Sequence, residues 1–302
     1  MIHAKDLTKK FEDTVALNGL NGNIPSGCIY GLVGANGSGK STFLRLIAGV
    51  YRPDAGTISV DGAYVSEQPK VREQIAFVPD DAYFLPSSDL RRMMLLYEAN
   101  NPRFSRALAT ELADRFRLPV RRSIGTFSKG MKRQAAILLA LASEPRYLLM
   151  DETFDGLDPV VRNMVKNLLY ESMLDRDMTV VMTSHSLREL EDTCDQLALL
   201  HQGGIVFESD VQNLKTSLFK VQIAFAEPFG KERFEKWSPL HYIQQGSVAT
   251  FLLRGDREAI KAELFGMEPL LLELLPLTLE EVFVHELDAL GYSFEKEEVR
   301  AK

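Results

Sequence analysis

A glycine-rich loop between a short apolar run and a helical pattern is the feature that most constrains this chain. Residues 28–33 read CIYGLV, the loop reads GANGSGKST, and FLRLIAG follows. The spacing G-x-x-x-x-G-K-S/T binds nucleotide phosphates when a strand precedes it and a helix follows. Glycines allow the tight turn that points backbone N–H groups inward, and the helix N-terminus adds its dipole. The predicted phosphate-binding residues are Gly34, Ala35, Asn36, Gly37, Ser38, Gly39, Lys40, Ser41 and Thr42.

Two carboxylates at the end of another apolar run complement this loop. Tyr147–Met150 reads YLLM, and Asp151 and Glu152 follow. Next to bound ATP, the Ser41 hydroxyl and Asp151 are expected to hold Mg²⁺, and Lys40 to bridge the β- and γ-phosphates. Glu152 is then the candidate general base for the attacking water. The alternative, an acidic pair that only caps a strand end, is weakened by the phosphate loop upstream.

The charge balance argues against nucleic acid as a partner. The 302 residues include 35 basic and 42 acidic side chains, a net charge of −7, whereas nucleic-acid-binding domains are commonly basic.

No apolar run in the sequence approaches the length of roughly 18 residues that a membrane span needs. The opening residues, MIHAKDLTKK, carry charges where a signal peptide would be apolar. Because the two cysteines, Cys28 and Cys194, lie far apart in the sequence, we expect a reduced, cytosolic chain.

Residues 1–214 alternate between short apolar runs and helical patterns. Buried parallel strands covered by helices are the usual result, so this part is predicted to be an α/β domain. The expected strands are Cys28–Val33, Gln74–Val78, Tyr147–Met150, Thr179–Thr183 and Gln196–His201. The expected helices are Ser41–Gly49, Arg103–Phe116, Lys132–Ala142, Val160–Leu174 and Leu187–Thr193. An all-helical insert is expected over 89–117, where Leu108, Leu112 and Phe116 recur every fourth residue.

Residues 215–302 are predicted to form a second, small α+β domain. Apolar residues at every second position over 219–225 predict a half-buried strand. A short helix over 231–237, a hairpin turning at 245–246, a helix over 257–265 and a strand over 270–275 are expected next. This order is that of a ferredoxin-like domain. A terminal helix over 278–290 begins with the capping-box spacing of Thr278 and Glu281.

Further motifs accompany the phosphate loop and the acidic pair. The sequence FSKGM at 127–131 precedes an apolar helical pattern, DGLDP at 155–159 follows the acidic pair, and His185 comes after the run TVVMTS. Phe11 lies upstream, in KKFEDTVAL. Together these motifs resemble those of ABC ATPases: a variant of the signature sequence, the D-loop, the switch histidine and the aromatic residue that stacks on adenine. Taken alone, a histidine at a strand end is more often structural.

The resemblance implies a P-loop NTPase fold of the ABC type, with a mixed sheet core and a helical subdomain at about 84–134. In this family two ATPase domains pack head to tail, and each ATP lies between one phosphate loop and the opposite signature. Ser128, which also suits a helix N-cap, would contact that nucleotide, and His185 would contact its γ-phosphate. Further nucleotide-binding positions implied by the family are Lys129, Gly130 and Asp158. Because the sequence holds one loop and one signature, the implied partner is a second copy or a homologous ATPase chain.

Two positions depart from the family pattern. Lys129 stands where the signature usually has its second glycine, and its charge is compatible with a γ-phosphate nearby. Asp80 and Asp81 follow QIAFVP, where the family usually has a glutamine that reaches the metal. A carboxylate is a competent ligand for a hard cation, so Asp80 is expected to contact Mg²⁺. A solvated turn is the alternative for this pair of carboxylates.

The resemblance favours an ATP-hydrolysing subunit that energises a membrane transporter, similar to those of ABC-2-type exporters. Such a subunit would lie on the inner face of the cell membrane, with the insert at 89–117 next to a polytopic membrane subunit. The segment LTLEEVFVHEL near the end of the chain is similar to endings in that exporter type. A soluble ATPase acting on ribosomes or nucleic acid is one alternative, disfavoured by the single ATPase domain. A nucleotide-dependent regulator whose tail binds a small ligand is another.

Overall fold

The computed structural model describes residues 1–289 and divides into two compact units. The first unit comprises Met1–Glu208, and the second begins at Ser209. The boundary that the sequence predicts, between residues 214 and 215, falls within α8 (Val211–Ser217), a helix of the second unit. Each unit has its own sheet system and its own hydrophobic core.

A six-stranded sheet forms the centre of the first unit. Its strand order is β10-β9-β3-β8-β7-β6, with β10 at Gly204–Asp210, β9 at Gln196–His201, β3 at Ile29–Val33, β8 at Thr179–Ser184, β7 at Tyr147–Met150 and β6 at Ile75–Val78. The pairs β3–β8, β3–β9, β6–β7 and β7–β8 are parallel. Every residue of β3 and β7 is buried, because both faces of the sheet are covered. The predicted α/β class is confirmed.

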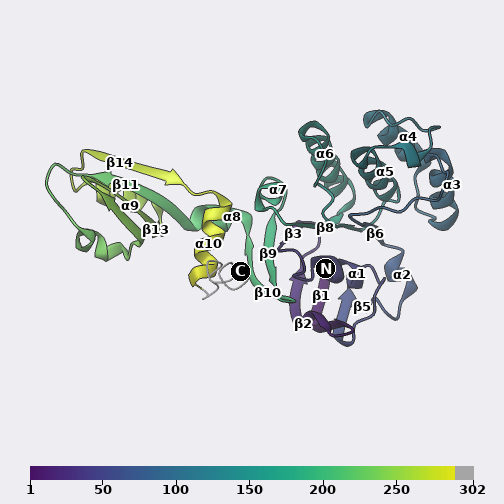
Figure 1. Cartoon of the computed structure of the whole chain (residues 1–302), viewed down its shortest axis with the longest axis horizontal. Helices are drawn as coiled ribbons and strands as arrows, with labels where there is room; N and C mark the ends of the chain where they lie inside the picture. Colours follow the sequence, from purple (N-terminus) through teal and green to yellow (C-terminus); the bar gives the residue numbers. More distant parts are fainter. Residues whose placement is uncertain (290–302) are drawn as a thin grey trace. The chain divides into compact units, whose positions relative to one another are not determined.

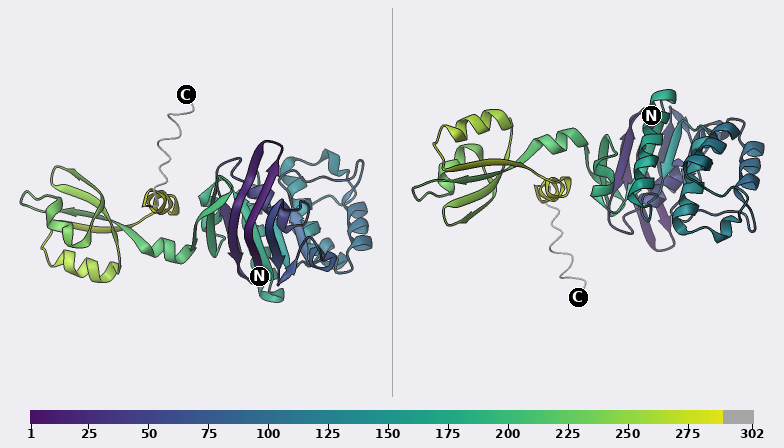
Figure 2. Two further views of the ribbon diagram at one scale, coloured as in Figure 1. Left: turned by 90° about the horizontal axis from the view of Figure 1, so that it is seen from below. Right: turned by 90° about the horizontal axis from the view of Figure 1, so that it is seen from above.

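A second, antiparallel sheet of the first unit was not predicted. Its order is β2-β1-β4-β5, with β1 at Ile2–Phe11, β2 at Thr14–Ile24, β4 at Ala55–Val60 and β5 at Ala63–Tyr64. The β1–β2 hairpin, coloured purple, is visible in the left view of Figure 2. Register shifts interrupt this pairing, and Asp6 has a positive φ of 49° there. Such bulges break the alternation by which a strand is recognised in a sequence.

Two layers cover the central sheet of the first unit. Figure 1 shows α1 (Lys40–Ile47) and the antiparallel sheet on one side of it. Phe43 and Leu44 of α1 belong to the same buried cluster as Leu17 and Tyr147. On the other side lie α3, α4, α5 and α6, at Leu90–Asn100, Arg106–Arg115, Lys129–Ala142 and Pro159–Arg176, and α7 at Leu187–Glu191. The remaining short helices are α2 (Pro69–Arg72) and η1 (Ile124–Thr126).

Side-chain caps set where the helices of the predicted insert begin. Asp89 accepts a hydrogen bond from the Arg92 N–H at the start of α3, and Ser105 accepts one from the Leu108 N–H at the start of α4. These caps satisfy backbone donors that have no partner inside the helix. The helix predicted over 103–116 therefore begins only at residue 106, after its cap.

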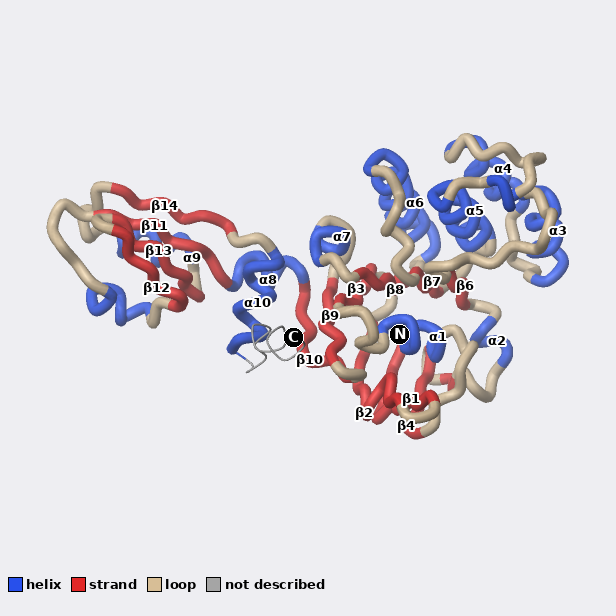
Figure 3. Tube along the Cα trace, viewed as in Figure 1, coloured by secondary structure: helices blue, strands red, loops and turns tan. Residues whose placement is uncertain are grey.

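The second unit contains a four-stranded sheet of order β12-β13-β11-β14 (Figure 3). The elements after α8 are β11 (Leu218–Ala224), η2 (Lys231–Trp237), β12 (Leu240–Gln245), β13 (Val248–Arg254), α9 (Arg257–Phe265), β14 (Leu271–Pro276) and α10 (Leu279–Ala289). Their order is the predicted one, with a 3-10 helix in the first helical place; the ferredoxin-like assignment remains a prediction. The Thr278 and Glu281 side chains and N–H groups form the predicted capping box. Leu290, the predicted end of the terminal helix, lies outside the described residues.

Candidate nucleotide site

The glycine-rich loop adopts a conformation that only glycine suits at two positions. Gly39, which immediately precedes α1, has a φ of 109°, and Gly37 has a φ of 82°. A Cβ atom on Gly39 would lie 2.5 Å from the Ala16 carbonyl oxygen, so the strand and the loop would have to separate. No side chain caps the N-terminus of α1. Its first N–H groups are therefore available for an anion, as the sequence predicts.

A cavity of about 510 Å³ opens beside this loop. Its lining residues are Thr14, Ala16, Asn36, Gly37, Gly39, Lys40, Ser41, Thr42, Asp80 and Glu152. Most of them come from the predicted phosphate loop, and Thr14 and Ala16 come from the adjacent strand β2. The volume lies within the range of small-molecule and cofactor sites.

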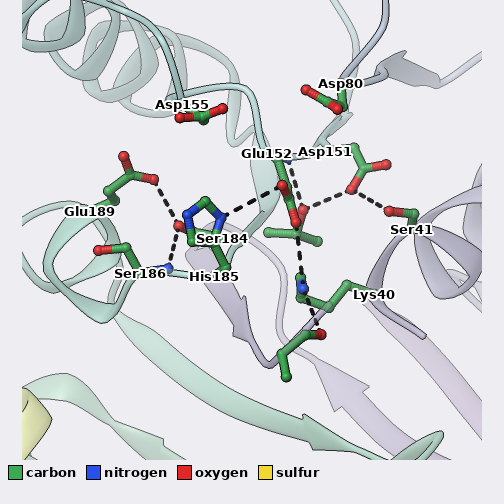
Figure 4. A network of polar contacts seen from close by, with 12 residues as sticks. Lys40, Ser41, Asp80, Asp151, Glu152, Asp155, Ser184, His185, Ser186 and Glu189 are labelled. Atoms are coloured by element: carbon green, nitrogen blue, oxygen red, sulfur yellow. Dashed lines mark hydrogen bonds and ion pairs between the residues drawn. The ribbon is translucent and has the colours of Figure 1, made fainter. Parts of the chain in front are cut away.

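Lys40 is held in place at the edge of this cavity. Its Nζ atom donates hydrogen bonds to the carbonyl oxygens of Gly34 and Ala35, at 2.7 and 3.2 Å. The same atom lies 3.5 Å from Glu152 Oε1 (Figure 4), and the side chain is 4% exposed. A cation in this position favours a negatively charged ligand in the cavity.

Ser41 and Asp151 come together as predicted for a metal site. Asp151 follows β7 and is buried, and its Oδ1 accepts hydrogen bonds from Ser41 Oγ at 2.9 Å and from Thr183 Oγ1 at 2.8 Å. A hydroxyl beside a carboxylate is a donor set that suits Mg²⁺, which prefers oxygen ligands and few protein groups. Among residues 1–289 no cluster of three or more His, Cys, Asp or Glu side chains is placed to hold a metal alone. The residues therefore fit a metal that is shared with phosphate oxygens.

Thr183 is a site residue that the sequence reasoning missed. Besides its bond to Asp151, its Oγ1 atom accepts the N–H of Glu152 at 2.9 Å. One buried hydroxyl thus orients both carboxylate residues. The available signal was a polar residue near the carboxyl end of a buried parallel strand, where ligand sites of α/β sheets commonly lie.

The Glu152 carboxylate lies between the Lys40 ammonium group and the His185 imidazole ring. Its Oε1 is 3.5 Å from Lys40 Nζ, and its Oε2 is 3.6 Å from His185 Nδ1. Its backbone has a φ of 45°, an uncommon value for a non-glycine residue. Strain of this kind is tolerated where the surrounding structure fixes it and is concentrated at functional sites. The predicted catalytic pair, Glu152 and His185, is therefore brought together (Figure 4).

A second polar cluster supports the turn that carries His185. The Ser184 hydroxyl donates to Glu189 Oε2 at 2.7 Å and accepts the Ser186 N–H at 2.9 Å. Arg162 of α6 lies 3.2 Å from the other Glu189 oxygen. These contacts tie the end of β8 to α6 and α7, so the His185 backbone is held by neighbours on both sides.

The predicted signature and D-loop residues have local structural roles within this chain. Ser128 caps α5 by accepting the Met131 N–H at 3.2 Å, and Asp158 caps α6 through two N–H bonds of 3.0 Å. The Lys129 side chain is 69% exposed, and its Nζ atom is 3.9 Å from Asp155. Ser128, Lys129, Gly130 and Asp158 are not among the residues that line the cavity. Their contacts to a nucleotide remain predictions that require a second ATPase domain.

Asp80 and Phe11 are placed differently from the other predicted residues. Asp80 lines the cavity, but its carboxylate pairs with the Arg133 guanidinium. The metal contact predicted for Asp80 thus remains a prediction, and it has to compete with this ion pair. Phe11 is 40% exposed and packs edge-on against Tyr51, with ring centroids 5.2 Å apart. It is not a lining residue of the cavity, so its predicted stacking on adenine also remains a prediction.

Comparison with known proteins decides the family. The ABC transporter family matches residues 17–155. The ABC transporter ATP-binding protein YtrB of Bacillus subtilis is 32% identical over 284 residues, which cover 94% of this chain and 97% of that protein. The chain belongs to the ABC transporter family. Its predicted membership of the ABC ATPases and its ATP-hydrolysing activity are thereby confirmed, and ATP is its nucleotide.

Other relatives and a solved structure agree with this ABC transporter assignment. The Nod factor export ATP-binding protein I of Rhizobium etli is 31% identical over 293 residues, covering 94% of this chain and 92% of that protein. A solved structure of an ATP-binding subunit of an ABC transporter superposes with a TM-score of 0.65 at 26% identity. The superposition covers 71% of this chain and 92% of the chain in that structure. The predicted P-loop NTPase fold is confirmed. No helix within residues 1–289 is long and apolar enough to cross a membrane.

Proposed function

We propose that this ABC protein is the ATP-hydrolysing subunit of a membrane exporter. The observation that carries the proposal is one cavity lined by Lys40, Ser41 and Glu152, with Asp151 hydrogen-bonded to Ser41. This arrangement suits ATP held at the helix N-terminus with a carboxylate at the reacting phosphate. The export direction rests on relatives such as the Rhizobium etli protein, which is named for Nod factor export.

The residues divide the chemistry among them. Lys40 and the N–H groups of α1 bind and orient the phosphates. Ser41 and Asp151 would hold Mg²⁺, which neutralises phosphate charge when it is bound. Glu152 accepts a proton from the attacking water, and His185, 3.6 Å from Glu152 Oε2, orients that carboxylate and contacts the γ-phosphate. Thr183 fixes both carboxylate residues through its hydroxyl.

The second half of the composite site is proposed to come from another ATPase domain. Ser128, Lys129 and Gly130 lie at the start of α5 and do not line the cavity of their own chain. A helix N-terminus with a lysine is suited to a γ-phosphate. A head-to-tail pair, made with a second copy or a homologous chain, places this element on the partner's nucleotide.

A groove beside the parallel sheet is proposed to receive the membrane subunit. It has a volume of about 420 Å³ and is lined by Glu73, Ile75, Ala76, Phe77, Leu96, Tyr97, Asn100, Asn101, Ala140, Ser143 and Pro145. Its walls come from β6, α3 and α5. Leu95 and Leu96 on α3 expose 49% and 39% of their surface, and exposed apolar surface beside a groove suits an amphipathic helix. The proposed partner is a polytopic membrane protein, and with such a partner this chain would lie at the inner face of the cell membrane.

Affinity purification from detergent-solubilised membranes tests the proposal. The tagged chain should co-purify with a polytopic membrane protein, and Leu96→Glu should abolish that association because it places a charge in the groove. Leu174→Glu, at a position on α6 that is 88% exposed, is the matched control and should leave it unchanged. Recovery of ribosomes or DNA in place of a membrane protein would refute the proposed function.

A further inference from the structure

Arg133 is a buried cation that reaches two loops of the site. It lies on α5, and its side chain is 3% exposed. Its Nη2 atom pairs with the Asp80 carboxylate, and its Nη1 atom lies 3.8 Å from Asp155 Oδ2. Asp80 follows β6, whereas Asp155 lies in the turn after β7. One guanidinium therefore joins two segments that the sheet holds separately.

The guanidinium has hydrogen-bonding capacity that these contacts do not use. Its Nε and Nη1 atoms are buried and have no hydrogen-bond partner within residues 1–289. Leaving buried donors unsatisfied is costly, so a residue that only anchored α5 would be better replaced by an apolar side chain. A contraction of about 0.8 Å between Nη1 and the Asp155 carboxylate would create a charge-assisted hydrogen bond. The second contact of Arg133 is thus available but not fully formed.

Both loops that Arg133 joins bear on the reacting carboxylate. Asp80 lines the nucleotide cavity together with Glu152. The Asp155 N–H donates to the Glu152 carbonyl oxygen at 3.2 Å, within the same tight turn. Figure 4 draws the carboxylates of Asp80, Asp155 and Glu152 in one view, with no contact from either aspartate to the Glu152 carboxylate. A link between Asp80 and Asp155 therefore fixes the segments on which the position of Glu152 depends.

We propose that Arg133 is a positioning residue for ATP hydrolysis. It spans Asp80 and Asp155 and completes its bond to Asp155 as hydrolysis proceeds, which holds the turn of Glu152 in the reactive geometry. Arg133 itself does not contact the nucleotide. The inference rests on the role proposed for Glu152, and it adds a residue outside the cavity to the reaction. A lysine cannot replace it, because a single ammonium does not span two carboxylates as a planar guanidinium does.

The central test separates catalysis from binding and folding. Arg133→Met keeps the length of the stem without the charge, and we expect kcat to fall roughly 100-fold, the scale of a misplaced catalytic group. The Kd for a fluorescent ATP analogue and the unfolding temperature should stay near the wild-type values. Arg133→Lys should recover little activity. Arg176→Met, which removes an arginine paired with Glu144 on the surface, is the control and should keep wild-type kcat.

Two measurements keep the test decisive if Arg133→Met folds poorly. Asp155→Asn removes the second contact from a carboxylate that is 47% exposed, so the variant should fold and should lower kcat without changing Kd. In the Arg133→Ala variant, guanidinium chloride at millimolar concentration should restore turnover, whereas sodium chloride at the same concentration should not. Wild-type kcat in Asp155→Asn, or no rescue by guanidinium, would overturn the inference.

A further variant distinguishes failure of this inference from failure of the proposed function. Glu152→Gln should abolish hydrolysis if the proposed site is correct. If Glu152→Gln is inactive and Arg133→Met turns over at the wild-type rate, only the positioning role of Arg133 is wrong. If Glu152→Gln hydrolyses ATP at the wild-type rate, the assignment of the reacting carboxylate is wrong as well.

Discussion

The Ser41 hydroxyl donates a hydrogen bond of 2.9 Å to Asp151 Oδ1, which joins the first turn of α1 to the end of β7. The two residues are far apart in the sequence, and the fold places them where a phosphate-bound cation would need both. The contact orients the hydroxyl and the carboxylate before any ligand arrives. The Mg²⁺ concentration that the reaction requires should therefore depend on Ser41 and Asp151.

Asp151→Asn should raise the Mg²⁺ concentration required for half-maximal turnover. The amide oxygen can still accept hydrogen bonds from Ser41 and Thr183, so the fold should persist while the charge that attracts the cation is lost. Removing such a metal-site partner typically costs roughly 10- to 100-fold in metal affinity or activity. A Mg²⁺ titration of turnover measures the effect, and an unchanged midpoint would exclude Asp151 from the metal site.

Asp80→Ala should lower kcat with a smaller shift in the Mg²⁺ midpoint than Asp151→Asn. The expected cause is loss of the ion pair with Arg133. Asp81→Ala is the matched control, since no hydrogen bond or ion pair of Asp81 is seen among residues 1–289, and it should retain wild-type turnover. A midpoint that moves as far for Asp80→Ala as for Asp151→Asn would instead establish the metal contact predicted for Asp80.

Glu152→Gln should abolish hydrolysis and preserve ATP binding. The amide has nearly the same shape as the carboxylate but cannot accept the proton of the attacking water. Because the nucleotide is then not consumed, ATP should convert the variant from monomer to dimer in sedimentation velocity. Ser128→Glu in the same background, which places a negative charge at the start of α5, should prevent that conversion. A dimer that forms regardless of Ser128→Glu would contradict the head-to-tail arrangement.

Thr183→Val should both destabilise the protein and reduce turnover. The substitution removes the buried hydroxyl that bonds Asp151 and the Glu152 N–H, and leaving these partners unsatisfied costs about 1–3 kcal/mol. Urea unfolding measures the first effect and steady-state hydrolysis the second. Thr183→Ser retains the hydroxyl and should recover most of both. A loss in Thr183→Ser as large as that in Thr183→Val would show that the hydroxyl alone does not account for the role of this residue.

The two cysteine thiols should react slowly in the native protein. Burial, reinforced by the nearby Asp195 carboxylate, raises the pKa of Cys28 to about 11, and the same causes raise the pKa of Cys194 well above its usual range. The thiolate is the reactive form, so a thiol reagent at pH 8 should modify neither residue quickly. Reaction should become fast in urea. Rapid labelling of the folded chain would show that these sites open readily.

The parallel sheet and the phosphate loop were predictable because they are locally encoded. The run IYGLV of β3 is buried on both faces, and its apolar composition reveals it without any knowledge of its neighbours. The antiparallel sheet was not predictable in this way. Gly19 and Gly22 in β2 have the sequence character of turns, although they lie within a strand, and Gly19 has a φ of 62°. Tertiary pairing with β1 overrides that local preference.

The candidate site was predictable in its motifs and not in its supporting contacts. Lys40 and Ser41 belong to the glycine-rich loop, and Asp151 and Glu152 follow β7. Each motif is a short continuous stretch of the chain, so its spacing can be recognised without knowledge of the fold. The contacts of Thr183 and Arg133 join segments that meet only through the sheet order β8-β7-β6 and the packing of α5. Contacts of this kind, between segments that are distant in the sequence, cannot be inferred from the spacing of residues.

The hydrogen bonds of Lys40 to the Gly34 and Ala35 carbonyls bear on how tightly a nucleotide can bind. An unrestrained lysine has about 2 kcal/mol of rotamer entropy to lose when it is immobilised. In this protein the loop backbone has already imposed most of that loss during folding. A free energy of this size corresponds to roughly 30-fold in a dissociation constant. The folded loop therefore strengthens ATP binding by reducing the side-chain entropy that is lost when the nucleotide binds.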